Sequence, residues 1–187
     1  MEFTRNNIQY KDLEKILITE DELSARIHQL AAQISKDYEG KRPLMVAILK
    51  GSIMFYTDLI RAMTIPVEMD FMSISSYGNG TKTSGEVKLI KDLDRIIEGK
   101  DLIIVEDIVD SGYTLSYLKR LLSARKPNSI KICTLLDKFE RREVELTPDY
   151  KGFDIGNEFV VGYGLDYAEI YRNLPEIGVL KPEVYQK

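Results

Sequence analysis

Cysteine and histidine, the side chains that most often carry nucleophilic or zinc chemistry, are nearly missing from this sequence. Its 187 residues include one cysteine, Cys133, and one histidine, His28. A single cysteine excludes an intramolecular disulfide and a cysteine-rich zinc site. His28 lies between the apolar positions of a helical stripe, which favours a surface or boundary position over catalysis. We therefore expect no Ser/His or Cys/His arrangement for covalent catalysis.

An excess of one charge and long apolar runs are also absent. The formal net charge is −4, and neither sign dominates either half of the chain. This balance gives no electrostatic reason to expect a nucleic-acid or membrane partner. No apolar run approaches the ~18 residues of a membrane span, and the N-terminal segment MEFTRNNIQY lacks the apolar core of a signal peptide. We expect a cytoplasmic protein that binds neither nucleic acid nor membrane.

Two common phosphate-binding motifs are missing as well. No G-x-x-x-x-G-K-[ST] occurs, because Gly40-Lys41 is followed by Arg42 and Gly99-Lys100 by Asp101. No G-x-G-x-x-G follows a predicted strand. Phosphate binding, if present, must use another kind of loop.

Apolar, β-branched runs alternate with helical patterns along most of the chain. The helical patterns cover residues 20–37, 53–63 and 113–124, and the apolar runs cover 43–49, 65–75, 101–107 and 129–136. Thr19 and Glu22 have the spacing of a capping box at the start of the first helix. The alternation predicts an α/β fold, a mostly parallel sheet flanked by helices on both faces.

The two ends of the chain fit this alternation less well, and we expect them to form a small hood over the sheet. Short strands are expected at residues 87–91 and 159–161, followed by an irregular C-terminal tail. The length suits a single domain spanning 1–187. Its core would cover about 40–145, and its hood about 1–15 and 146–187.

The stretch from Ile104 to Leu115 carries the clearest functional signal. A buried strand brings Glu106 and Asp107 to its carboxyl end, where ligands of open α/β sheets bind. The loop that then opens a helix offers free amides and hydroxyls, which suit a phosphate. Two carboxylates beside a phosphate need sugar hydroxyls or Mg²⁺ between them. The predicted ligand is a metal-bound sugar phosphate, and the loop residues are Asp110, Ser111, Gly112, Tyr113 and Thr114.

This segment resembles the phosphoribosyl pyrophosphate signature of type I phosphoribosyltransferases. An acidic pair after a strand is usually a solvated loop, but here every defining position of the signature matches. The resemblance implies that Glu106 and Asp107 bind the ribose and, with Asp166, the metal. It also implies that the loop from Asp110 to Thr114 binds the 5′-phosphate.

Other segments between about residue 40 and residue 175 resemble the hypoxanthine–guanine branch of that family. On this resemblance Leu49-Lys50-Gly51-Ser52 is the pyrophosphate loop, whose Leu–Lys peptide bond is often cis. Residues 76–86 would be a flexible loop that closes over the site. The pyrophosphate residues implied are Lys50, Gly51, Ser76, Tyr77 and Arg172.

The same resemblance implies a purine subsite. Lys138 follows the strand at 129–136 and would hydrogen-bond the purine O6, thereby selecting 6-oxopurines over adenine. Phe159 would stack on the base, Val160 would contribute backbone groups to its edge, and Asp166 would lie near the base and the metal. Asp110 is the candidate general base for the proton on N7. Because an unperturbed aspartate has a pKa of about 4, we expect Glu106 and Asp107 to raise that of Asp110.

The reaction implied is displacement of pyrophosphate by N9 of hypoxanthine or guanine, with Mg²⁺ as cofactor. Relatives are commonly dimers or tetramers, so a homo-oligomer is expected. Two alternatives stay open. A xanthine-preferring enzyme would differ only in contacts to C2 of the base. A regulatory RNA-binding protein with this fold should carry a basic face, which the charge of −4 and the retained Asp110, Lys50 and Arg172 disfavour.

Overall fold

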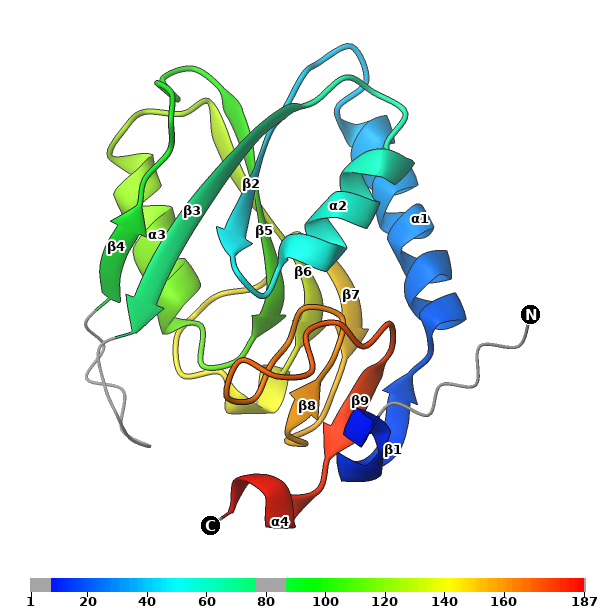
Figure 1. Ribbon diagram of the computed structural model, residues 1–187. Helices are drawn as coiled ribbons and strands as arrows, with labels where there is room; N and C mark the ends of the chain where they lie inside the picture. The colour runs from blue at the N-terminus through cyan, green and yellow to red at the C-terminus, as the bar shows by residue number, and fades with distance from the viewer. Residues whose placement is uncertain (1–7, 77–86, 187) are drawn as a thin grey trace.

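A six-stranded sheet forms the centre of the protein, which is described here from a computed structural model covering residues 8–76 and 87–186 (Figure 1). Its strand order is β4-β3-β2-β5-β6-β7, and only β4 runs antiparallel to its neighbour. The strands are β2 (Leu44–Leu49), β3 (Glu68–Ser76), β4 (Val87–Lys91), β5 (Asp101–Val109), β6 (Ser129–Asp137) and β7 (Tyr150–Asp154). The predicted mostly parallel sheet is confirmed.

Helices cover both faces of this sheet, as the alternation predicted. Helices α1 (Glu20–Asp37) and α2 (Ile53–Ala62) lie on one face, and α3 (Tyr113–Ser123) lies on the other (Figure 1). The capping box at the start of α1 is confirmed, because the Thr19 amide donates to the Glu22 carboxylate at 2.8 Å and the Glu22 amide donates to the Thr19 hydroxyl. Alternate residues of β2 and β5 enter opposite cores: Met45 and Ile103 face α1 and α2, whereas Val46 and Ile104 face α3. Burial on both faces explains the continuous apolar runs.

A second, three-stranded sheet forms the hood (Figure 1). Its antiparallel strands lie in the order β1 (Leu13–Ile18), β9 (Ile177–Leu180), β8 (Val160–Val161). A 3₁₀ turn, η1 (Ile8–Asp12), precedes β1, and the short helix α4 (Pro182–Tyr185) follows β9. The hood therefore joins segments from both ends of the chain.

Two expectations about the C-terminal part are wrong. The tail is not irregular, because the four residues of β9 are all buried as the middle strand of the hood. The hood also does not begin at residue 146, because β7 pairs in parallel with β6 at the edge of the large sheet. A short strand without alternation, such as Ile-Gly-Val-Leu, shows its role only when its neighbours are in place.

Among the residues that the structure describes, no helix combines the length and the apolar character needed to cross a membrane.

Candidate active site

Three parallel strands end next to one another at one edge of the large sheet. β2 ends at Leu49, β5 at Val109 and β6 at Asp137, and the register pairs Val109 directly with Asp137. The residues that follow these strands are Lys50, Asp110 and Lys138, each of them predicted to bind or act on substrate. Parallel topology thus brings three separate sequence motifs to one edge.

A pocket of about 410 Å³ lies at this edge. Its walls combine the ends of β2 and β5, the start of α3 and the segment after β8. Apolar side chains of β2 and β3 complete it. The predicted site residues that line it are Gly51, Glu106, Asp107, Thr114, Asp166 and Arg172.

The turn after β2 packs directly against Asp107. The Leu49–Lys50 peptide bond is cis, the form that the resemblance implied. At Gly51, a Cβ atom would stand only 1.7 Å from Asp107 Oδ2. Any side chain here would have to displace Asp107, so glycine is required for this close approach.

The loop after β5 turns at Gly112, which is the N-cap of α3. Its φ of +87° lies in the left-handed region, and a Cβ atom would meet the Arg142 and Val144 side chains at 2.8 Å. Glycine is therefore needed for both conformation and space. The first amides of α3 have no acceptor within the helix, and the Thr114 side chain lines the pocket beside them. This is the geometry of a phosphate-binding helix start.

Ser111 and Tyr113, the remaining residues of that loop, take other positions. The Ser111 carbonyl accepts a hydrogen bond from the Glu143 amide at 3.0 Å. The Tyr113 side chain is exposed, and a hydrogen bond with Glu143 raises its pKa above the usual value. Tyr113 can therefore contribute its backbone to a phosphate site, but its ring lies toward solvent.

Glu106 and Asp107 form a strained electrostatic pair. Burial raises the pKa of Glu106 well above its usual value, and the charge of Asp107 raises it further. Burial also raises the pKa of Asp107. Two adjacent carboxylates in a half-buried pocket are stabilised by a cation or by hydroxyl donors, and a sugar with bound metal supplies both.

The three carboxylates predicted to bind metal share the pocket without forming a closed metal cage. Glu106, Asp107 and Asp166 all line it, yet the described residues contain no group of three acidic, histidine or cysteine side chains close enough to hold an ion by themselves. Asp166 is already engaged, because Arg172 lies 2.7 Å from its Oδ1 and the Glu169 amide donates to its Oδ2. This arrangement fits Mg²⁺, which keeps several waters and takes one or two carboxylates together with substrate oxygens.

Asp110 faces cations rather than the acidic pair. Its Oδ1 lies 2.9 Å from Arg141 Nε. Its charge also acts on Lys138, where burial lowers the lysine pKa and Asp110 partly offsets that effect. The acids that interact with each other are Glu106 and Asp107. The end of β5 turns Asp110 toward the η2 turn (Phe139–Arg141) after β6, and the effect of the acidic pair on Asp110 stays a prediction.

Lys138 and Phe159 are brought together by one hydrogen bond. Lys138 is 5% exposed, and its Nζ donates to the Glu158 carbonyl at 2.8 Å, immediately before Phe159. Val160, also predicted for this subsite, is buried at the start of β8. The Phe159 ring is 36% exposed and stacks on Tyr185 of α4, with ring centroids 4.7 Å apart. Sequence reasoning missed Tyr185, because a lone tyrosine near the C-terminus carries no pattern.

Of the two predicted pyrophosphate cations, Arg172 lines the pocket, and Lys50 directly follows Leu49, another lining residue. Arg172 donates to the Gly164 carbonyl at 2.7 Å and pairs with Asp166. Lys50 Nζ lies 3.1 Å from Glu169 Oε2, an ion pair that lowers the pKa of Glu169. Ser76, another predicted pyrophosphate residue, ends β3, and only its backbone is described; Tyr77 and the rest of the predicted loop to residue 86 lie outside the described residues.

Unpaired polar atoms concentrate at this edge of the sheet. Within the described part of the chain, four buried side-chain atoms have no hydrogen-bond partner. Three of them belong to predicted site residues: Glu106 Oε2, Asp110 Oδ1 and Arg172 Nε. In the case of Asp110 the nearby Arg141 forms an ion pair without a hydrogen bond. Because buried polar groups are normally paired, these atoms indicate a polar ligand.

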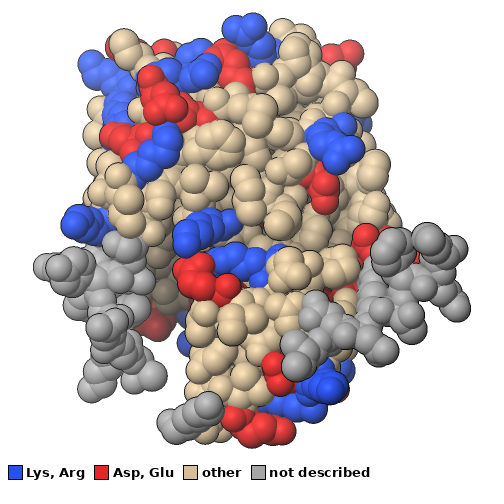
Figure 2. Space-filling model, in the orientation of Figure 1, with Lys and Arg blue, Asp and Glu red and all other residues tan. Residues whose placement is uncertain are grey.

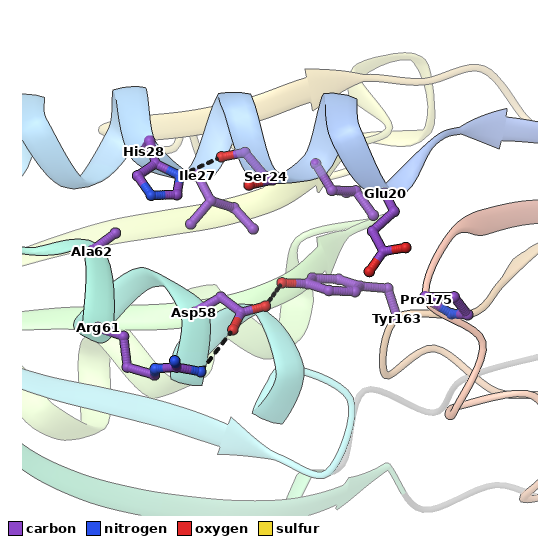
Figure 3. Close-up of a pocket in the computed structure, with 10 residues that line it drawn as sticks. Glu20, Ser24, Ile27, His28, Asp58, Arg61, Ala62, Tyr163 and Pro175 are labelled. Carbon is purple, nitrogen blue, oxygen red and sulfur yellow. Dashed lines mark hydrogen bonds and ion pairs between the residues drawn. The ribbon is translucent and has the colours of Figure 1, made fainter. Parts of the chain in front are cut away.

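A second cavity, of about 350 Å³, lies between α1 and α2 (Figure 3). Tyr163 points into it, and its hydroxyl donates to Asp58 of α2 at 2.5 Å. Tyr163 precedes the segment that carries Asp166 and Arg172, so this bond attaches that segment to α2. His28 is exposed at the cavity's edge and bonds the Ser24 carbonyl, which confirms its predicted boundary position.

Comparisons with known proteins agree with this geometry. Residues 16–168 match the family model of the phosphoribosyl transferase domain. The hypoxanthine-guanine phosphoribosyltransferase of Lactococcus lactis is 56% identical over 177 residues, which cover 95% of this chain and 96% of that protein. The crystal structure of a hypoxanthine phosphoribosyltransferase from Staphylococcus aureus superposes with a TM-score of 0.94 at 50% identity, covering 97% of this chain and 99% of that one.

A third relative is much longer. The bifunctional protein TilS/HprT of Listeria monocytogenes is 56% identical over 182 residues, which are 97% of this chain. The chain spans only 28% of that protein's length. The similarity therefore concerns one part of the Listeria protein.

Proposed function

This chain belongs to the phosphoribosyl transferase domain family, and on that premise we propose that it transfers the 5-phosphoribosyl group from phosphoribosyl pyrophosphate to N9 of hypoxanthine or guanine. The products are IMP or GMP and pyrophosphate, a purine salvage reaction. The names of the Lactococcus and Staphylococcus relatives support this choice of base. The observation that carries the proposal is that the start of α3, an acidic pair and Arg172 line one pocket, with Lys50 linked to Arg172 through Glu169.

The sugar phosphate is bound by the end of β5 and the start of α3. The free amides of α3 and the Thr114 hydroxyl hold the 5′-phosphate. Glu106 and Asp107 accept hydrogen bonds from the ribose hydroxyls and place negative charge near C1, where positive charge develops as pyrophosphate leaves. Lys50 and Arg172 hold the pyrophosphate.

When bound, Mg²⁺ would neutralise part of the charge on the departing pyrophosphate. Asp107, Glu106 and Asp166 are the carboxylates that would hold it, together with water and substrate oxygens. The unpaired Oε2 of Glu106 fits that role.

The purine is selected at the end of β6. Lys138 donates to the O6 of a 6-oxopurine, whereas adenine presents an amino group there, so that two donors would face each other. Phe159 provides a stacking surface worth about 1–3 kcal/mol that tolerates different bases. Asp110 takes the proton from N7. Selectivity thus depends on Lys138, and affinity depends on the ring.

We also propose that residues 1–187 act as one domain and as a homo-oligomer, either a dimer or a tetramer. The exposed apolar side chains of Met54 and Ile170 are candidates for the contact with another copy.

The test is a transfer assay with phosphoribosyl pyrophosphate, Mg²⁺ and one base at a time: hypoxanthine, guanine, xanthine, adenine or uracil. We expect turnover with hypoxanthine and guanine. In the Lys138→Met variant, the preference for hypoxanthine over adenine in kcat/KM should fall by about 10²-fold or more, because a buried donor for O6 is lost. Lys119→Met, on the exposed face of α3, is the matched control. Adenine or uracil as the best substrate of the unmodified protein would refute the assignment.

The two alternatives are tested alongside. Xanthine as the best substrate would indicate a xanthine-preferring enzyme. On the face shown in Figure 2, Lys and Arg side chains are interspersed with Asp and Glu, which disfavours a basic RNA-binding surface there. A filter-binding assay with mixed RNA should therefore detect no complex at physiological salt.

A further inference from the structure

The two cations assigned to pyrophosphate share an acidic side chain of the protein itself. Glu169 Oε2 lies 3.1 Å from Lys50 Nζ and 3.5 Å from Arg172 Nη2. One carboxylate oxygen therefore stands between the ammonium group and the guanidinium group. Lys50 and Glu169 are 119 positions apart in the chain, so the contact is made by the fold and not by local helix geometry.

The segment that carries Glu169 is folded back toward the pocket. Three of its non-glycine residues, Ala168, Glu169 and Tyr171, have left-handed φ angles of 51°, 63° and 79°. The Glu169 amide donates to Asp166 Oδ2 at 2.9 Å, and Tyr167 pairs with Ile170. Left-handed residues other than glycine are uncommon. The backbone thus directs the Glu169 side chain onto the cations.

We propose that Glu169 is an internal competitor of pyrophosphate, whose carboxylate neutralises Lys50 and Arg172 until the diphosphate of the substrate displaces it. The inference rests on the proposed function, in which these two cations bind pyrophosphate. The same carboxylate opposes rebinding of the product. Glu169 therefore lowers the affinity for pyrophosphate and speeds its release.

The geometry suits a side chain that must be displaced easily. The Lys50 and Glu169 side chains are 68% and 66% exposed, so their attraction is screened by water. Arg172 keeps its bonds to Asp166 and to the Gly164 carbonyl when Glu169 moves away, so the guanidinium stays in place. A diphosphate brings several anionic oxygens to the same two cations and outcompetes a single carboxylate.

The test compares pyrophosphate binding in variants that differ in charge at this position. Pyrophosphate with Mg²⁺ is titrated calorimetrically into the unmodified protein, Glu169→Gln, Glu169→Asp and Glu98→Gln. Glu98 is exposed beside the amino end of β5, at the opposite edge of the sheet, and its variant makes the same change in net charge. It controls for any general electrostatic effect.

Glu169→Gln removes the carboxylate that competes with pyrophosphate for Lys50 and Arg172. Because only an exposed ion pair is lost, pyrophosphate binding should tighten by roughly three- to tenfold. The gain should shrink as salt is raised, because screening weakens the carboxylate's effect. The KM for phosphoribosyl pyrophosphate should fall by a similar factor, with the KM for the purine unchanged and kcat not raised. Glu98→Gln should behave like the unmodified protein. Glu169→Asp, which keeps the charge, should stay within about twofold of it.

Glu169→Gln with unchanged or weaker pyrophosphate binding overturns the inference, and so does Glu169→Asp that tightens binding as much as Glu169→Gln. If the unmodified protein transfers phosphoribosyl to an oxopurine while the variants do not differ, only the inference fails. If the unmodified protein neither binds pyrophosphate nor transfers phosphoribosyl, the proposed function fails, and the inference fails with it.

Discussion

Asp110 differs from its acidic neighbours in the groups that surround it. Glu106 and Asp107 act on each other inside the pocket, where burial raises the pKa of both. Asp110 instead faces Arg141 and acts electrostatically on Lys138, the residue assigned to the purine O6. Its interaction with Lys138, in the proposed purine subsite, supports Asp110 as the general base.

The Asp110→Asn variant tests that role. An amide cannot take the N7 proton, and general-base catalysis contributes about 10²–10⁴-fold, so kcat should fall by at least about 10²-fold. The KM values for both substrates should change much less. Steady-state kinetics measure kcat and KM. A far-UV circular dichroism spectrum that matches the unmodified protein shows that the variant is folded. A folded variant with normal kcat would remove Asp110 from the chemistry.

Arg141→Gln serves as the companion variant. It removes the ion pair with Asp110 and leaves the carboxylate in place. If Asp110 is the base, this variant should keep most of the kcat that Asp110→Asn loses.

At the scale of elements, Arg142 joins the ends of two strands. Its guanidinium donates to the Asp110 carbonyl after β5 at 3.1 Å and to the Leu146 carbonyl at 2.6 Å. It also pairs with Asp137 at the end of β6, and both side chains are buried. The side chain passes beside Gly112, which leaves it room. Arg142 therefore fixes the loop after β5 relative to the end of β6, which Lys138 follows.

Arg142→Met should destabilise the protein by about 3 kcal/mol, because the buried Asp137 carboxylate then keeps only its longer, 3.6 Å ion pair with the partly exposed Lys151. Urea denaturation measures the free energy of unfolding. The double variant Arg142→Met/Asp137→Leu should recover most of the loss, since both charges are then removed. Equal destabilisation of the single and double variants would mean that the Arg142–Asp137 pair is not what holds the two strand ends.

For the whole molecule, the two edges of the large sheet carry opposite electrostatics. At the amino edge, bonds from Lys100, Arg125 and Ser129 lower the pKa values of their acidic partners, which are Glu68, Asp92 and Asp101. At the carboxyl edge, burial raises the pKa values of Glu106 and Asp107. Ion-paired carboxylates stabilise the amino edge of the sheet. At the carboxyl edge, a bound ligand would stabilise the buried carboxylates of Glu106 and Asp107.

Because of the acidic residues at the amino edge, we expect the free energy of unfolding to fall at low pH. Because their folded pKa values lie below the unfolded ones, their contribution is present above about pH 4 and is lost as pH falls through the folded values. Asp92 accepts two bonds of 2.7 Å from Arg125. Asp92→Asn should cost about 1 kcal/mol or less at pH 7, since the pair is partly exposed, and the difference should disappear near pH 3.

Urea denaturation at several pH values measures this effect, with Glu98→Gln as a variant of equal charge change. A difference between Asp92→Asn and the unmodified protein that persists unchanged at pH 3 would show that the stabilisation does not depend on the Asp92 charge.

Much of the fold and of the site is predictable because it depends on neighbours in the chain. The stripe and capping box of α1, the apolar runs of β2, β5 and β6, and the turn at Gly112 are local features, since periodicity, caps and turns need only a few adjacent residues. The predicted ribose and phosphate residues from Glu106 to Thr114 are also neighbours in the chain. Local patterns were less informative for β1, β7 and β9, short strands whose identity depends on their partners.

The sequence alone determined the order of the elements and predicted which residues bear the chemistry. Only the tertiary structure decided which groups face one another: Asp110 toward Arg141, Phe159 against Tyr185, and Glu169 between Lys50 and Arg172. The physical reason is that strand pairing and packing across the sheet bring together residues whose separation in the chain leaves no periodic trace. The groups that surround a carboxylate determine its pKa and whether it competes with a ligand for a cation. These contacts therefore determine how the site works.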